Sequence, residues 1–332
     1  MAGRHKVICI QAIHDKGMQI LRDRSDIELI VPDSQEPQAW QHHLADAAGL
    51  IVRVQKIPRW IMEQAPNLKI ISRHGVGVDN IDMDAARDHG IIVATVGQAN
   101  AASVVEHTLA LMLALAKQIP QFDRDVRTGD YWRKLKLDAV DIRGRTVLII
   151  GLGRIGSRLA VVLNALGMHC IGVDPAYSAQ QIEAMGCEAA VDFRSVLPRA
   201  DFVTVHCPMQ PDTRGMIGTA ELAAMKPTAY VINCARGGIV DEAALLAALD
   251  KGQIKAAALD VQVTEPPTPD DPLLKCDRLI LTPHAATATV ECIQASAVAV
   301  AHNITEYFDG CLTRERVFDP SVIARHPGRI AG

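Results

Sequence analysis

The chain of 332 residues lacks the features that would place it in several specialised classes of protein. It has no basic excess: 34 Lys and Arg stand against 38 Asp and Glu, and the formal net charge of -4 gives no reason to expect nucleic-acid binding. No apolar run approaches the roughly 20 residues that span a bilayer. The N-terminal MAGRHKVICI also lacks a signal-peptide cleavage pattern. We therefore expect a cytoplasmic protein that binds neither nucleic acid nor membrane.

Disulfide and metal motifs are missing as well. The 8 cysteines form no CxxC pair, and most lie in apolar runs such as the one around Cys9. This distribution is typical of reduced thiols in a protein core. The 12 histidines are dispersed and include no HExxH pattern. The sequence therefore predicts neither a disulfide framework nor a metal site.

What the sequence does contain is an alternation of short apolar runs and longer helical patterns. The runs are continuously apolar, which is typical of parallel strands covered on both faces. We predict strands at Val7–Ile10, Ile27–Val31, Leu50–Val52, Lys69–Ile71, Ile91–Ala94, Thr146–Ile150, Cys170–Val173, Phe202–Val205, Tyr230–Ile232, Ala257–Leu259 and Leu279–Leu281. Helices are predicted at Ala101–Gln118, Ser157–Leu166 and Ile293–Tyr307, and an arm on the surface or in an interface at Phe122–Asp141. The expected fold class is doubly wound α/β.

One predicted strand and helix enclose the glycine-rich turn GLGRIG at 151–156. Gly151 allows a tight turn, Gly153 lets a pyrophosphate approach the backbone, and Gly156 lets helix and strand pack closely. The helix N-terminus offers free N–H groups to phosphates. Asp174, followed by Pro175, ends the next strand, where a carboxylate accepts hydrogen bonds from ribose hydroxyls and repels a 2′-phosphate. The sequence therefore predicts a site for NAD, which we favour over NADP.

Five further segments resemble the D-isomer-specific 2-hydroxyacid dehydrogenases, and within that family the branch of phosphoglycerate dehydrogenases and hydroxypyruvate/glyoxylate reductases. They are SRHGVGVDNID at 72–82, VHCPMQPDTRGMI at 205–217, INCARGGIVDEAAL at 232–245, ALDVQVTEPP at 258–267 and LTPHAATAT at 281–289. The resemblance covers nearly the whole chain from about residue 45 to 310.

The resemblance implies two doubly wound domains. A flavodoxin-like substrate domain would comprise residues 1–100 and 287–332, and a Rossmann NAD-binding domain of residues 101–286 would be inserted into it. Catalysis would take place in the cleft between them. It also implies a homodimer, which the apolar helix Ala101–Gln118 and the arm would form.

The resemblance also assigns the catalytic residues: Arg236, Glu265 and His284 match the family's Arg, Glu and His. Moving a hydride at C2 requires moving a proton at the C2 oxygen, and histidine titrates in the range that this task needs. Glu265 would orient the ring and stabilise its cation. Arg236 would hold the substrate carboxylate and polarise the carbonyl with its fork of donors.

Further residues match motifs that bind the cofactor or the substrate in this family. Further cofactor contacts are expected at Val104, Arg154, Ile155, His206, Cys207, Pro208, Thr213, Cys234, Ala235 and Asp260. Val76 and Gly77 match the turn whose backbone N–H groups bind the substrate carboxylate, and Arg53 and Arg73 match basic positions of the phosphoglycerate branch. These matches predict a small D-2-hydroxy or 2-oxo acid with a polar or anionic C3 substituent.

Two departures from the branch leave the substrate open. Ala285, Ala286 and Thr287 replace a glycine-containing turn, and Gln262 replaces the usual aromatic residue. Two alternative functions also stay open. One is an NAD(H)-sensing scaffold like the C-terminal-binding-protein corepressors, which share this fold and keep the catalytic trio. The other is oxidation of formate or phosphite, which we rank lower because neither has a C2 hydroxyl to deprotonate.

Overall fold

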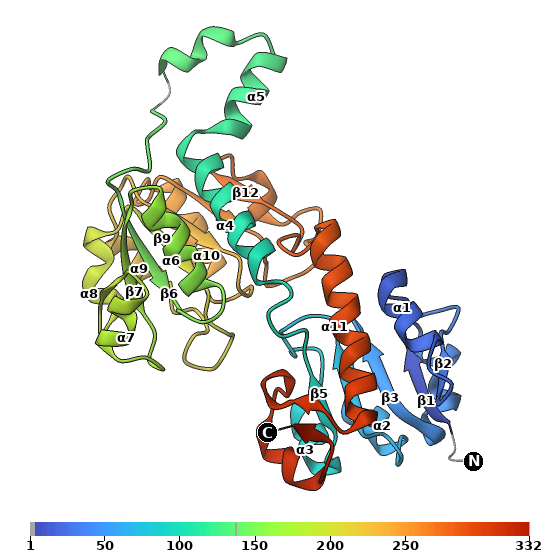
Figure 1. The fold of residues 1–332 in the computed structure, drawn as a ribbon. Helices are drawn as coiled ribbons and strands as arrows, with labels where there is room; N and C mark the ends of the chain where they lie inside the picture. Colours follow the sequence, from blue (N-terminus) through green and yellow to red (C-terminus); the bar gives the residue numbers. More distant parts are fainter. Residues whose placement is uncertain (1–3, 137, 332) are drawn as a thin grey trace. The chain divides into compact units, whose positions relative to one another are not determined.

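The computed structural model describes residues 4–136 and 138–331, and its internal contacts divide the chain into two units (Figure 1). Unit 1 comprises Met1–Asn100 and Ala288–Gly332, and unit 2 comprises Ala101–Thr287. The division expected from the sequence differs in one residue, because it placed Thr287 with the first unit.

The described residues of unit 1 form a five-stranded parallel sheet in the order β2-β1-β3-β4-β5. The strands are β1 (His5–Cys9), β2 (Ile27–Ile30), β3 (Ala47–Val52), β4 (Ile70–Arg73) and β5 (Ile92–Ala94). This is the flavodoxin-like order, in which the chain reverses direction across the sheet between β1 and β3. The predicted fold class is therefore confirmed for this unit.

Both faces of this sheet are covered, as its continuously apolar strands require. Val7 packs in a core with α1 (Asp15–Arg22) and α11 (Val290–Asp309), while its neighbour Ile8 packs on the opposite face with α2 (Arg59–Glu63) and α3 (Met83–His89). Gly17 lets α1 approach α11, since a Cβ there would lie 2.3 Å from the carbonyl oxygen of Ala297. After α11 the chain adds β13 (Leu312–Thr313), β14 (Ile330–Ala331) and the 3-10 turns η6 (Arg314–Arg316) and η7 (Pro320–Arg325).

Unit 2 is built on a seven-stranded parallel sheet in the order β12-β11-β10-β9-β6-β7-β8. The strands are β6 (Thr146–Ile150), β7 (His169–Val173), β8 (Glu188–Ala189), β9 (Phe202–Val205), β10 (Tyr230–Asn233), β11 (Ala256–Leu259) and β12 (Leu279–Leu281). Counted from β6, the first six follow the Rossmann order 3-2-1-4-5-6. The switch point lies between β6 and β9, where Ile150 pairs with Val205. Ligands of open α/β sheets bind at this point, beyond the carboxyl ends of the strands.

Helices cover both faces of this second sheet. One core includes side chains of α4 (Ala101–Ala116), α6 (Gly156–Ala165) and α7 (Ala179–Ala184), and the other includes side chains of α8 (Phe193–Val196), α9 (Thr219–Ala224) and α10 (Glu242–Asp250). Helix α4 ends two residues before the predicted Gln118, because Gln118 itself adopts a left-handed conformation with φ of 52°.

The segment after α4, for which the sequence predicted an arm but no helix, is helical. It forms the helix α5 (Ile119–Arg127) and the 3-10 helix η3 (Tyr131–Lys136), and Figure 1 shows both standing away from the sheet of unit 2. Buried Asp125 joins them, since Oδ1 accepts hydrogen bonds from Gln121 Nε2 at 2.6 Å and from Arg133 Nη1 at 3.4 Å. Leu137, within the predicted arm, lies outside the described residues.

The described ranges 4–136 and 138–331 bear on the expectations for membrane and metal. No single helix in these ranges is long and apolar enough to cross a membrane. Taken together, α4 and α5, which meet at a bend of 58°, have the length and apolar composition of a membrane span. Over the same ranges no three His, Cys, Asp or Glu side chains are grouped so as to hold a metal ion.

Candidate active site

The glycine-rich turn follows β6 at the switch point of unit 2. Gly151 has φ of 93°, and a Cβ there would lie 2.7 Å from the carbonyl carbon of His206. A Cβ at Gly156 would lie 2.0 Å from the carbonyl oxygen of Gly151, so only glycine lets α6 begin this close to the strand. A Cβ at Gly153 would meet no described atom within 4 Å. The turn thus leaves open space at Gly153, before the N-terminus of α6, which fits a pyrophosphate.

Asp174 lies at the end of the neighbouring strand β7 and is half-buried. Its Oδ2 accepts a hydrogen bond from the backbone N–H of Leu152 at 2.8 Å, inside the glycine-rich turn, and its Oδ1 accepts one from Ala176 at 2.9 Å. Each carboxylate oxygen keeps a second lone pair, so Asp174 fixes the turn and can still accept from a ribose. Pro175 and Arg154 are exposed, and half-buried Ile155 precedes α6.

The loop after β9 lies against the glycine-rich turn, because the N–H of His206 donates to the carbonyl of Ile150 at 2.7 Å. Burial lowers the pKa of His206 to about 4, which keeps the ring neutral, and Nε2 lies 2.9 Å from Thr204 Oγ1. Burial also raises the pKa of the Cys207 thiol to about 11. Thr213 closes the loop, since its hydroxyl donates to the carbonyl of Pro208 at 2.8 Å.

His284 and Glu265, which the sequence placed in one catalytic group, are in contact. His284 follows β12, Glu265 follows the adjacent strand β11, and His284 Nδ1 lies 2.8 Å from Glu265 Oε2. The other carboxylate oxygen, Oε1, accepts the backbone N–H of Gln262 at 2.9 Å, which orients the carboxylate. Because Glu265 occupies Nδ1, Nε2 is the ring nitrogen that can exchange a proton with another molecule. The imidazole side chain is 48% exposed.

Arg236 lies in the loop after β10, the next strand of the sheet. Asn233, buried at the end of β10, shapes this loop: Nδ2 donates to the carbonyl of Arg236 at 2.8 Å, and Oδ1 accepts from the N–H of Ala235 at 2.9 Å. A Cβ at Gly237 would lie 2.0 Å from the carbonyl oxygen of Gln262, so glycine lets the Arg236 loop pack against the loop that leads to Glu265. Sequence reasoning missed Asn233, although a polar residue that ends an apolar strand is a usable signal.

His284 has an unusual backbone conformation, with φ of 52°. Its N–H donates to the carbonyl of Asp260 at 2.8 Å, and the next two N–H groups, of Ala285 and Ala286, donate to Asp260 Oδ1 at 2.8 Å and Oδ2 at 3.0 Å. Asp260 is fully buried. This carboxylate therefore holds the turn that carries His284, a structural task that the motif did not indicate.

The remaining positions expected at the cofactor lie in the buried part of unit 2. Val104 is buried in α4, and Cys234 and Ala235 follow β10. Burial raises the pKa of the Cys234 thiol to about 12, so the thiol stays protonated at neutral pH.

The positions expected to bind substrate in unit 1 lie after β3 and at the end of β4. Arg53 and Arg73 are half-buried there, and Val76 and Gly77 form the turn that follows. Burial, with the charges of Arg53 and Arg73, lowers the pKa of His74 to about 4. The His74 ring is therefore neutral at pH 7, and the positive charge at this edge of the sheet comes from the two arginines.

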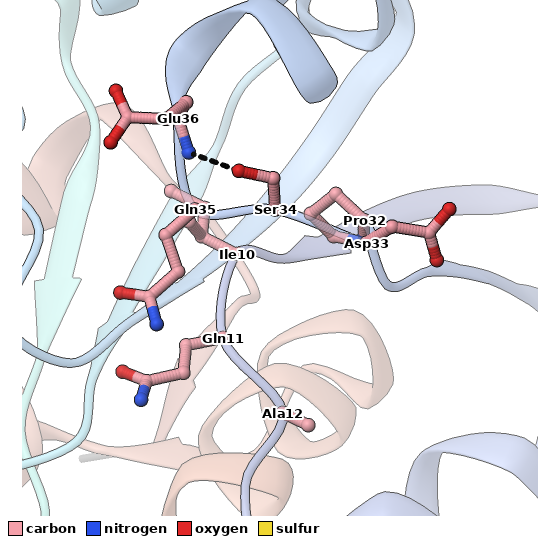
Figure 2. A pocket seen from close by; sticks show the side chains of 8 residues that line it. All are labelled: Ile10, Gln11, Ala12, Pro32, Asp33, Ser34, Gln35 and Glu36. Carbon is pink, nitrogen blue, oxygen red and sulfur yellow. Dashed lines mark hydrogen bonds between the residues drawn. The ribbon is translucent and has the colours of Figure 1, made fainter.

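A surface hollow of about 500 Å³ lies at the carboxyl ends of β1 and β2 (Figure 2). Figure 2 shows Gln11 and Gln35 beside each other in this hollow, and both accept hydrogen bonds from Gln55 Nε2, at 3.3 Å and 2.6 Å. Gln55 Oε1 in turn accepts the backbone N–H of Arg53 at 3.2 Å. The hollow itself is lined by none of the predicted site residues.

Comparison with known proteins identifies the family. Residues 109–286 match the model of the D-isomer specific 2-hydroxyacid dehydrogenase NAD binding domain, and the chain belongs to this family. The resemblance inferred from the sequence is thereby confirmed, and so is the prediction of a domain that binds NAD.

A curated relative and two solved structures show how far the similarity extends. D-3-phosphoglycerate dehydrogenase of Methanocaldococcus jannaschii is 39% identical over 98% of this chain, which spans 62% of that relative's length. The NADPH-dependent glyoxylate/hydroxypyruvate reductase of Sinorhizobium meliloti has a TM-score of 0.82 and 28% identity, over 92% of this chain and 95% of that one. The NAD-dependent formate dehydrogenase of Staphylococcus aureus has a TM-score of 0.83 and 26% identity, over 95% and 99%.

Proposed function

We propose that the protein is an NAD-dependent dehydrogenase that transfers a hydride between NAD(H) and C2 of a small D-2-hydroxy acid or 2-oxo acid. The observation that carries this proposal is the 2.8 Å contact between His284 Nδ1 and Glu265 Oε2. Both residues belong to unit 2, which also carries the glycine-rich turn at its switch point. A carboxylate at Nδ1 orients the imidazole and leaves Nε2 to exchange a proton, as a histidine acid–base group requires.

His284 moves the proton and Glu265 assists it. When the 2-oxo acid is reduced, Nε2 of the protonated ring donates to the C2 oxygen, and in the reverse direction the neutral ring takes the hydroxyl proton. Glu265 stabilises the cation through Nδ1 and keeps Nε2 directed away from itself. Arg236 binds the substrate carboxylate and polarises the carbonyl. NAD(H), when bound, supplies or accepts the hydride.

The proposal assigns the cofactor to residues of unit 2. Gly151, Gly153 and Gly156, with Arg154 and Ile155, bind the pyrophosphate, and Asp174 with Pro175 binds the ribose. The loop of His206, Cys207, Pro208 and Thr213 borders the adenosine and phosphates. Val104, Cys234 and Ala235 contact the nicotinamide end, and Asp260, whose side chain is 0% exposed, acts there through the turn that it holds. The half-buried Asp174 carboxylate supports NAD over NADP, because it would repel a 2′-phosphate.

The substrate carries a polar or anionic group at C3. Arg53 and Arg73 support this, since they bring two fixed positive charges to the carboxyl edge of the sheet in unit 1. Val76 and Gly77 bind the substrate carboxylate with backbone N–H groups. Similar proteins named for 3-phosphoglycerate and hydroxypyruvate, whose C3 bears phosphate or hydroxyl, support the same class of compound.

A substrate panel tests the proposal. Purified protein is assayed with NADH and NADPH on 2-oxo acids whose C3 bears phosphate, sulfonate, hydroxyl or hydrogen, and with NAD on the matching hydroxy acids and formate. We expect turnover of a 2-oxo acid with NADH, and loss of that turnover with retained NADH binding in His284→Gln. Arg53→Gln should reduce kcat/KM for anionic substrates by about tenfold, the effect of one charge-assisted hydrogen bond. Arg59→Gln, which removes an exposed charge paired with Asp88, is the matched control.

Other outcomes would assign another function. Turnover of formate alone would favour a formate dehydrogenase. NADH binding without turnover of any member, together with capture of a peptide partner, would favour the NAD(H)-sensing scaffold. Equal efficiency on lactate-like and phosphorylated or sulfonated substrates would remove the case for a C3 anion site.

We also propose that the protein is a homodimer formed through α4, α5 and η3. Val126, Trp132 and Leu135 are 61%, 68% and 77% exposed on this segment, and an apolar surface of this kind fits a second copy of the chain. Trp132→Glu should shift the protein from dimer to monomer in light scattering. Val191→Glu, at a fully exposed valine elsewhere in unit 2, should leave the dimer intact. A monomeric wild type at micromolar concentration contradicts the proposal.

A further inference from the structure

We propose that His107 is a positioning residue: together with Thr282 it holds the buried carboxylate of Asp260, and that carboxylate fixes the turn that presents His284. The proposal rests on the proposed function for its catalytic consequence. The contacts themselves belong to three elements of unit 2, which are α4, the end of β11 and the end of β12.

The carboxylate of Asp260 is a charge without access to water, with 0% of its side chain exposed. Such a group is stable only when hydrogen-bond donors replace its hydration. Oδ1 accepts from the Thr282 hydroxyl at 2.6 Å and from Ala285 N–H at 2.8 Å, and Oδ2 accepts from Ala286 N–H at 3.0 Å. The last two donors belong to the turn after His284, so charge and turn stabilise each other.

His107 completes this network from helix α4. Its Nε2 lies 3.1 Å from Thr282 Oγ1 and 3.3 Å from Asp260 Oδ1. The Thr282 hydroxyl has a single proton, which it gives to Asp260 at the shorter distance of 2.6 Å, so it can only accept from His107. Nε2 of His107 therefore carries a hydrogen, and this N–H lies within reach of both Thr282 Oγ1 and Asp260 Oδ1. The His107 side chain is 22% exposed, so its ring connects the fully buried carboxylate with the surface of unit 2.

The network matters because the backbone of His284 is strained. A non-glycine residue at φ of 52° is in the left-handed region, which costs about 1 to 2 kcal/mol and persists only where the surroundings hold it. Three successive N–H groups, from His284 to Ala286, donate to Asp260, and they supply that constraint. If Asp260 loses donors, the turn relaxes and the imidazole moves away from Glu265.

The ¹⁵N signals of the His284 ring show directly whether the imidazole stays in contact with Glu265. In ¹⁵N-histidine-labelled protein without substrate, the His284 signals are identified by their loss in His284→Gln. In the wild type we expect the neutral ring to carry its hydrogen on Nδ1, facing Glu265. His107→Phe keeps a ring of similar size without the donor, and His284 should then show a mixture of the two tautomers. His107→Gln, which returns an N–H near the position of Nε2, should restore the wild-type signals.

A second pair of variants and a control make the test independent of one substitution. Thr282→Val should reproduce the mixed tautomers, and Thr282→Ser should not. Glu106→Gln, at the exposed neighbour of His107 on α4, should leave the His284 signals unchanged. In the substrate assay, His107→Phe should lower kcat about tenfold, and His107→Gln should recover most of it.

The proposal is overturned if His107→Phe and Thr282→Val lower the melting temperature while the His284 signals stay as in the wild type, because both residues would then be structural only. If either variant does not fold, the other decides in the same way. The nitrogen signals need no turnover. A protein that reduces no 2-oxo acid therefore refutes the proposed function, and only unchanged His284 signals refute the role of His107.

Discussion

The open space at Gly153 makes the cofactor site testable without knowledge of the substrate. An added methyl group at Gly153 meets no described atom within 4 Å, and Gly153 does not have the positive φ of Gly151. Gly153→Ala should therefore leave the melting temperature unchanged or raise it slightly, because Gly-to-Ala changes at compatible positions stabilise by about 0.4 to 1 kcal/mol. The same methyl group occupies the space in which we place the pyrophosphate.

The cost to cofactor binding follows from the hydrogen bonds that the phosphates make with the turn. If the methyl group prevents one charge-assisted hydrogen bond of this kind, binding weakens by about 1.5 to 3 kcal/mol. The dissociation constant of NADH should then rise about ten- to a hundredfold. The assay is a titration of NADH fluorescence beside a thermal unfolding curve, with the wild type and Gly153→Ala at the same protein concentration.

Gly156→Ala is the contrasting variant. Its Cβ would lie 2.0 Å from the carbonyl oxygen of Gly151, so the start of α6 must move away from the strand. Overpacking of this kind costs about 1 to 3 kcal/mol, and the melting temperature should fall by several degrees. If Gly153→Ala binds NADH as tightly as the wild type while Gly156→Ala behaves as expected, the open space at Gly153 is not where the phosphates bind, and our placement of the cofactor is wrong.

Three further predictions concern charge and protonation. Asp174→Asn keeps an oxygen for the N–H of Leu152 and removes the charge, so the kcat/KM for NADPH relative to NADH should rise about tenfold, and better use of NADPH by the wild type would contradict our interpretation. Glu265→Gln removes the carboxylate that holds His284 Nδ1, so kcat for 2-oxo acid reduction should fall about tenfold while NADH binding is retained. An unchanged kcat would remove Glu265 from this role. The pKa of His206 is lowered from 6.5 to about 4, so below pH 6.5 the unfolded chain takes up a proton that the folded chain does not, and stability falls. From pH 7 to pH 5 the ionisation of this group should lower the free energy of unfolding, measured with denaturant, by about 2 kcal/mol. In His206→Gln the free energy of unfolding should fall by correspondingly less over the same range.

The fold class and the main site motifs are largely determined by local sequence. Continuous apolar runs such as Thr146–Ile150 specify strands covered on both faces, and the glycine spacing at 151–156 specifies a turn whose close contacts involve nearby backbone. Glu265 and His284 are in contact as their motifs predicted. Elements with little local signal were missed: β8 has two residues, too few to show a period, and α5 is charged and depends on the partners of buried Asp125.

Only the tertiary structure decided what supports the contact between His284 and Glu265. His107, Asp260 and Thr282 come from a helix and two strand ends far apart in sequence, and their hydrogen bonds exist because parallel packing brings those ends together. A periodic pattern shows which face of an element is buried, but it does not show which polar group will face it there. The left-handed conformation of His284 likewise cannot be read from its residue type, because it is uncommon for any residue other than glycine. The buried carboxylate of Asp260 holds the turn in it from another strand.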